Sequence, residues 1–78
     1  MTNREIYNEC FVKAFGVTAD EAPTLEYEAI PAWDSVGHMT LIAEIEDAFD
    51  IMMETDDIID LSSYEVGIEM LKKYDVEI

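Results

Sequence analysis

Trp33-Asp34-Ser35-Val36-Gly37-His38-Met39 is the stretch where a proline-containing loop gives way to a strongly amphipathic helix. Asp34 is a preferred N-cap residue type, because its carboxylate accepts hydrogen bonds from unpaired backbone N–H groups of the first turn. Ser35 is then expected at the first helical position, with its hydroxyl at the positive end of the helix dipole. A phosphate attached there would be stabilised by the dipole and by free N–H groups. Ser35 is therefore a candidate for carrying a covalently held anion, and an ordinary helix start is the competing interpretation.

The helix that follows is predicted over Ser35–Phe49 and has two apolar faces when its residues are placed at steps of 100°. The face expected to pack in the core, with His38 near it, consists of Leu41, Ile42, Ile45, Ala48 and Phe49. The opposite face and its acidic flanks consist of Val36, Met39, Thr40, Ala43, Glu44, Glu46, Asp47 and Asp50. An apolar strip with an acidic rim, beginning next to Ser35, predicts a docking surface for a partner that has basic residues around a shallow apolar site. The alternative is that another element of the chain covers this face.

A first helix is predicted over Asn3–Phe15. Thr2 and Glu5 form a capping box at its start, and Gly16 is a suitable residue to end it with a positive φ. Cys10 falls within its apolar stripe, where a free cysteine usually acts as a small hydrophobic residue. The loop that follows is broken by two prolines, and three apolar side chains are expected to pin it to the core: Leu25, Ile30 and Trp33.

Two more helices are predicted near the end of the sequence. Thr55 can cap a short one, with Asp56 and Asp57 in its first turn, where acidic residues complement the dipole. Its inward side chains, together with packing residues of the preceding connector, are expected to be Ile51, Met52, Met53, Ile58, Ile59 and Leu61. Ser62 and Glu65 form a second capping box for a last helix that ends at about Tyr74, and Gly67 within it permits a close helix approach.

The expected fold class is all-α: a single domain over residues 1–78, built as a small four-helix bundle. It has three main helices, one short helix and a long loop between the first two. Length and composition agree, because 78 residues allow one domain and half of the residues are hydrophobic.

The net charge of −15 limits the classes of partner. The four basic residues are Arg4, Lys13, Lys72 and Lys73, and no positive charge lies between Lys13 and Lys72. Such a surface repels nucleic acid and anionic membranes and attracts basic patches on proteins. One cysteine excludes an intramolecular disulfide, and no stretch has the character of a signal peptide or membrane span, so a cytoplasmic location is expected.

The pattern Asp34-Ser35-Val36, Met39, Leu41-Ile42, Ile45-Glu46-Asp47 and Phe49, with the order of helices, resembles the acyl carrier protein family over nearly the whole chain. The resemblance implies a non-catalytic carrier in which a phosphopantetheinyl transferase attaches 4′-phosphopantetheine from coenzyme A to Ser35. The arm's thiol then carries an acyl group as a thioester, in fatty acid or polyketide biosynthesis.

The resemblance also implies docking residues and partners. The docking residues are Val36, Met39, Ala43, Glu44, Glu46 and Asp47, with Asp56, Asp57 and Asp60 contributing. The partners are the transferase, an acyl-loading ligase or acyltransferase, and a downstream synthase with basic patches; the carrier itself is expected to be a monomer. Trp33, Gly37, His38 and Thr40 depart from the housekeeping fatty-acid carriers and favour a stand-alone carrier of a specialised biosynthetic system. The peptidyl-carrier motif is absent, and an aminoacyl cargo stays an alternative.

Other classes of function fit the residues less well. A catalytic triad of Asp34, Ser35 and His38 is rejected, because one helical turn does not orient acid, histidine and serine correctly and Asp34 is used as a cap. No metal site is expected, because the aspartates near residues 56–60 lack the glycine and terminal glutamate of a calcium loop. The remaining rival is an acidic helical protein-binding module without a prosthetic group, which occupies a basic site or mimics nucleic acid.

Overall fold

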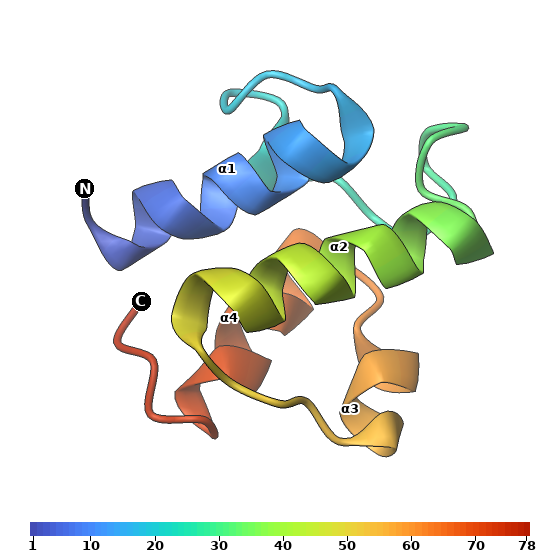
Figure 1. Ribbon diagram of the computed structural model, residues 1–78. Coiled ribbons are helices and arrows are strands. Elements are labelled where there is room, and N and C mark those ends of the chain that lie inside the picture. The colour runs from blue at the N-terminus through green and yellow to red at the C-terminus, as the bar shows by residue number, and fades with distance from the viewer.

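The computed structural model describes residues 1–78 and contains four α-helices and no strand (Figure 1). The helices are α1 (Asn3–Phe15), α2 (Ser35–Phe49), α3 (Thr55–Asp60) and α4 (Tyr64–Lys72), with a short 3-10 helix η1 (Ala22–Thr24) in the long loop. Apart from the helices, a single antiparallel bridge joins Glu26 and Ser63. The predicted all-α class, the three main helices with one short helix, and the long loop between the first two helices are confirmed.

The ends of α1 and α2 lie at the predicted residues because local capping determines them. The Thr2 hydroxyl accepts from the Glu5 N–H at 3.1 Å while the Glu5 carboxylate accepts from the Thr2 N–H at 2.8 Å, which completes the capping box. Gly16 ends α1 with a φ of 71°. Asp34 caps α2, and its carboxylate accepts from the Gly37 N–H at 2.8 Å.

The predicted caps of the last two helices are wrong by one residue. Glu54, not Thr55, is the N-cap of α3, and no side chain bonds to that helix start. Ser63, not Ser62, caps α4, because its hydroxyl accepts from the Val66 N–H at 3.1 Å. Helix α4 ends at Lys72, so Tyr74 lies in the turn that follows it.

The core lies where α1, α2 and α4 meet. Helices α1 and α2 run side by side in opposite directions (Figure 1). The largest fully buried side chains are Trp33, Tyr7, Phe11, Leu41, Ile42, Ile45, Leu61 and Leu71. The predicted close helix approach at Gly67 is confirmed, because a Cβ there would lie 2.1 Å from Tyr7 Oη.

The long loop is held on the core and on the α3–α4 connector. Trp33 and Leu25 are buried, as predicted, and Ile30 packs against the core. The Tyr27 N–H donates to the Ser62 carbonyl at 2.8 Å, and the Tyr64 N–H donates to the Leu25 carbonyl at 3.1 Å. These bonds place Tyr27 next to α3, beside the start of α2.

Three side chains predicted to point inward are exposed instead. Ile59 is 71% exposed and Met52 is 85% exposed, and Ala48 also faces solvent. Adjacent residues of a helix point 100° apart, so the six-residue α3 cannot bury both Ile58 and Ile59 against the same neighbours. In the connector, Met53 is the methionine that enters the core.

Candidate functional site

Ser35 is the first residue of α2 and is exposed. Asp34 binds two N–H groups of the first turn: its carboxylate accepts from Gly37, and its carbonyl accepts from His38 at 2.8 Å. The N–H groups of Ser35 and Val36 have no partner within the protein. The serine hydroxyl therefore lies beside two free donors at the positive end of a helix of 15 residues.

Gly37 allows the loop to pack directly on this first turn. A Cβ at Gly37 would lie 1.8 Å from the Ala32 carbonyl oxygen and 3.2 Å from Phe15 Cε1. A backbone oxygen cannot rotate away as a flexible side chain can, so a larger residue would push the loop off α2. The sequence alone did not identify this requirement, because it depends on the fold of the loop around residue 32.

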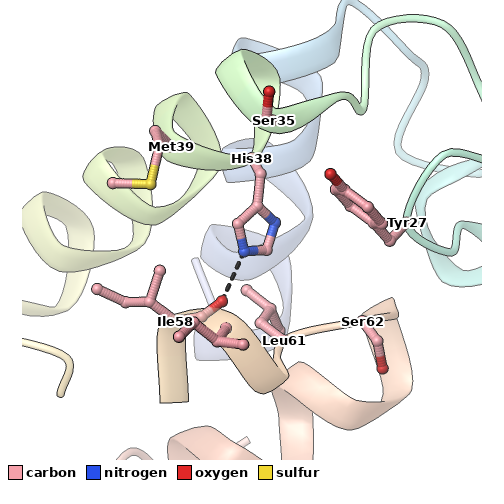
Figure 2. Close-up of a pocket in the computed structure, with 8 residues that line it drawn as sticks. Tyr27, Ser35, His38, Met39, Ile58, Leu61 and Ser62 are labelled. Carbon is pink, nitrogen blue, oxygen red and sulfur yellow. Dashed lines mark hydrogen bonds between the residues drawn. The ribbon is translucent and has the colours of Figure 1, made fainter. Parts of the chain in front are cut away.

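A pocket of about 450 Å³ opens beside Ser35, between α2 and α3 (Figure 2). Its lining is mainly apolar and consists of Tyr27, Ser35, His38, Met39, Ile58, Ile59, Leu61 and Ser62. Pockets for small organic ligands in proteins have volumes of roughly 300–1,000 Å³, with apolar walls and a few polar groups. The volume and lining suit an apolar group tethered at Ser35.

His38 joins three parts of the molecule at one side of this pocket. Its Nδ1 accepts from Trp33 Nε1–H at 3.0 Å, and its Nε2 lies 2.6 Å from the Ile58 carbonyl oxygen (Figure 2). A carbonyl only accepts, so the network requires the proton on Nε2. Both ring nitrogens are engaged, and neither is free to accept the Ser35 proton. The imidazole therefore ties α2 to the loop and to α3.

The predicted apolar strip is exposed next to the pocket. Val36 is 74% exposed and Met39 is 54% exposed, and Ala43 continues the strip along α2. Ile59, which we expected inside, faces solvent from α3 and also lines the pocket. We define the apolar rim as Val36, Met39 and Ile59. The exposure of Ile59 could not be predicted from the sequence, because a helix of six residues is too short for its pattern to show which side faces the core.

The predicted acidic docking residues are distributed over α2 and α3. Glu44 and Asp47 line a different hollow, between α1 and α2. Glu46 is half-buried, and its carboxylate accepts from the Met53 N–H at 2.8 Å, so it fastens the connector after α2. Asp56 and Asp60 are exposed on α3.

Asp57 is the docking prediction that the structure contradicts. Its side chain is buried, with Lys73 Nζ at 2.7 Å and the Tyr74 hydroxyl hydrogen-bonded to its other oxygen. The Lys73 hydrogen bond, followed by that of Tyr74, lowers the pKa of Asp57 below its usual value. Asp57 therefore anchors α3 to the segment after α4 and is not an exposed carboxylate.

No group of three histidine, cysteine or acidic side chains converges in a way that could hold a metal ion. No helix has both the length and the apolar character needed to cross a membrane. Comparisons with family models, with curated proteins and with solved structures find no match to this chain. A functional conclusion therefore depends on the geometry around Ser35.

Proposed function

We propose that this protein is a phosphopantetheine-dependent acyl carrier with Ser35 as the attachment residue, serving as a stand-alone carrier in a specialised biosynthetic system. The observation that carries the proposal is an exposed serine at the N-terminus of α2 that is one of the residues lining an apolar pocket of about 450 Å³. An ordinary helix start would need neither the pocket nor the exposed apolar rim beside it.

The residues present suit a phosphodiester on Ser35. The free N–H groups of Ser35 and Val36 can donate to its oxygens, and the helix dipole favours its charge. In the attachment step, Ser35 Oγ forms a bond to the phosphorus of coenzyme A that bears the pantetheine. The pyrophosphate P–O bond breaks, adenosine 3′,5′-bisphosphate leaves, and the serine proton passes to the transferase.

When bound, the arm supplies a thiol that carries an acyl group as a thioester. The protein's part is to shelter the cargo between α2 and α3. Met39 and Ile58 provide apolar contacts in the pocket, and Leu61 closes its floor toward the core (Figure 2). Methionine adapts to irregular shapes, so Met39 suits a wall that meets different cargoes.

Docking of partner enzymes is proposed at the apolar rim of Val36, Met39 and Ile59. Met39 and Ile59 line the pocket, and Val36 is exposed on α2 directly after Ser35. The net charge of −15 would speed the encounter with basic patches on a transferase, a loading enzyme and a synthase. A small apolar contact with charge steering allows fast exchange among successive partners.

The test is the intact mass of the protein after incubation with coenzyme A and a broad-specificity phosphopantetheinyl transferase. We expect the gain of one phosphopantetheine, lost in Ser35→Ala. Ser62→Ala is the matched control, because Ser62 is exposed and lines the same pocket but does not begin a helix. It should be modified like the wild type.

An unmodified, folded protein, with a transferase that still modifies another carrier, would contradict the proposal. The acidic protein-binding module without a prosthetic group would then be the better interpretation. Modification that persists in Ser35→Ala would place the attachment at another residue and refute the role of Ser35.

A further inference from the structure

We propose that the pocket beside Ser35 selects, as the cargo of the carrier, an uncharged acyl group with a single aromatic ring. This selectivity rests on the proposed carrier function and adds the chemical class of the acyl group to it. Three features of the pocket support this class: the absence of charge in its lining, its closed floor, and a series of stacked rings that ends at its wall.

The lining of the pocket carries no charged side chain, although the chain as a whole has a net charge of −15. All 19 acidic and all 4 basic side chains lie outside the eight residues that line it. Moving a charged group into apolar surroundings without a partner is costly. A cargo that ends in a carboxylate or an ammonium group is therefore disfavoured in the pocket, which argues against an aminoacyl group.

The pocket is closed toward the interior, which limits the length of the cargo. Its lining belongs to α2, α3, the connector after α3 and the loop around Tyr27, and none of it belongs to α1 or α4. Leu61 at the floor is buried, and the core contains the rings of Tyr7, Phe11 and Tyr64, which pack on one another. None of the other three cavities shares a lining residue with this pocket. A long acyl chain therefore finds no continuous path into the core.

A series of stacked rings leads from α1 to the wall of the pocket. Phe15 stacks on Trp33, with ring centroids 5.1 Å apart and 28° between the planes, and Trp33 stacks on His38 at 6.2 Å and 14°. Both nitrogens of His38 are hydrogen-bonded within the protein, so the imidazole offers a cargo its aromatic surface and no hydrogen bond. Because His38 also lines the pocket, a ring placed there would extend the series by one.

Tyr27 and Met39 lie on opposite sides of the imidazole and shape the space for a flat group (Figure 2). The Tyr27 ring is nearly perpendicular to His38, at 81° with centroids 5.6 Å apart, and the Tyr27 N–H is held by the Ser62 carbonyl. This ring is 40% exposed, so part of it is free to contact a ligand. Aromatic rings prefer stacked or edge-to-face partners, and a thioether makes favourable contacts with a ring. A single ring finds all three partners here, whereas an aliphatic group of equal size gains burial alone.

The preference of the pocket can be measured with free ligands on the nitrogen-15-labelled wild-type protein, purified without a phosphopantetheine arm. N-ethylbenzamide represents the aromatic cargo, and its amide stands for the thioester end. N-ethylcyclohexanecarboxamide is the matched control, because it has the same number of carbon atoms and no aromatic face. We expect a Kd about three- to tenfold lower for the benzamide, at the strength of one aromatic contact, with amide shifts centred on residues 35–39 and 58–62. N-ethylmalonamate, which carries a carboxylate, should not bind.

Two substitutions at one position separate the ring of Tyr27 from its hydroxyl. Tyr27→Leu keeps an apolar side chain but removes the ring, and it should lower the preference for the benzamide to less than about twofold. Tyr27→Phe keeps the ring and should retain the preference. Ile59→Leu changes the aliphatic part of the lining without altering any ring, and it should retain the preference as well.

The outcomes distinguish the selectivity of the pocket from the carrier function. Absence of binding, equal Kd values for the two amides in the wild type, or equal loss of the preference in Tyr27→Phe and Tyr27→Leu would each overturn the aromatic selectivity, even if Ser35 accepts phosphopantetheine. A protein that prefers the benzamide but cannot be modified at Ser35 would uphold the selectivity of the pocket and refute the carrier function alone.

Discussion

Substituting Gly67 with alanine sets helix propensity against packing. Alanine is about 1 kcal/mol more favourable than glycine inside a helix, so propensity alone predicts that Gly67→Ala stabilises the protein. The new Cβ, however, would lie 2.1 Å from Tyr7 Oη and 2.8 Å from Leu61 Cδ1. Both neighbours are buried, so the steric term opposes the propensity term.

The structure indicates that packing prevails. The Tyr7 ring is held between Phe11 and Tyr64, with ring centroids 5.0 and 4.8 Å away, and its hydroxyl donates to the Tyr64 carbonyl at 2.7 Å. Overpacking costs about 1–3 kcal/mol, and loss of the hydrogen bond costs about 1 kcal/mol more. After the gain from propensity, the free energy of unfolding should fall by about 2 kcal/mol. For a domain of this size the melting temperature should fall by roughly 8–16 °C.

Urea unfolding followed by far-ultraviolet circular dichroism measures this effect. Tyr7→Phe alone should cost about 1 kcal/mol, because it removes the hydrogen bond to the Tyr64 carbonyl. The same change also removes Tyr7 Oη, which is the atom closest to the new Cβ of Gly67→Ala. The double variant should therefore be more stable than the sum of the single effects predicts, by about 1 kcal/mol. Glu65→Ala, exposed on the same helix, should change stability by less than about 0.5 kcal/mol. A stabilised Gly67→Ala protein, or strict additivity, would refute the packing argument.

Three further outcomes are expected. Added sodium chloride should raise the melting temperature, because 19 acidic and 4 basic side chains leave strong self-repulsion that salt screens; a flat response would show that this repulsion is unimportant. The pKa of Asp57 is lowered in the folded protein, so the stabilisation that its ionised carboxylate gives to the fold is complete above about pH 4. This stabilisation disappears as the pH falls through the lowered pKa. The difference in unfolding free energy between the wild type and Asp57→Asn should thus shrink in acid, and a constant difference would contradict this role. Glu46→Ala should lower the free energy of unfolding by about 1 kcal/mol, because the Met53 N–H loses its acceptor. Asp47→Lys should leave urea unfolding unchanged and slow the loading of Ser35. If Asp47→Lys destabilised the protein and Glu46→Ala slowed loading instead, the structural role of Glu46 and the docking role of Asp47 would be exchanged.

The parts of the fold that could be predicted from the sequence depend on interactions over a few residues. Thr2 with Glu5, and Asp34 with Gly37, bond across three positions, so α1 and α2 begin where the residue types indicate. Trp33 was expected inside because a large apolar side chain stands next to a helix start. These features need no knowledge of how the helices pack.

The errors arise where contacts are distant along the chain. Asp57 looked like an exposed acid of a helix start, but its partners are 16 and 17 residues away. The hollow that Glu44 lines was not foreseen because its opposite wall belongs to α1. The pocket beside Ser35 exists only because α3 approaches α2, and the residues of a short helix do not reveal the position of its neighbour.

The stacking of Trp33 on His38 has an optical consequence. The two rings lie 6.2 Å apart at an angle of 14°, and Trp33 is the single tryptophan of the chain. The tryptophan fluorescence of the protein therefore comes from one indole that is shielded from water. The imidazole of His38, which is stacked on that indole, lines the pocket. Any occupant that displaces His38 alters the quenching of that indole. The protein thus contains its own fluorescence reporter of pocket occupancy, which can be followed in real time without a label.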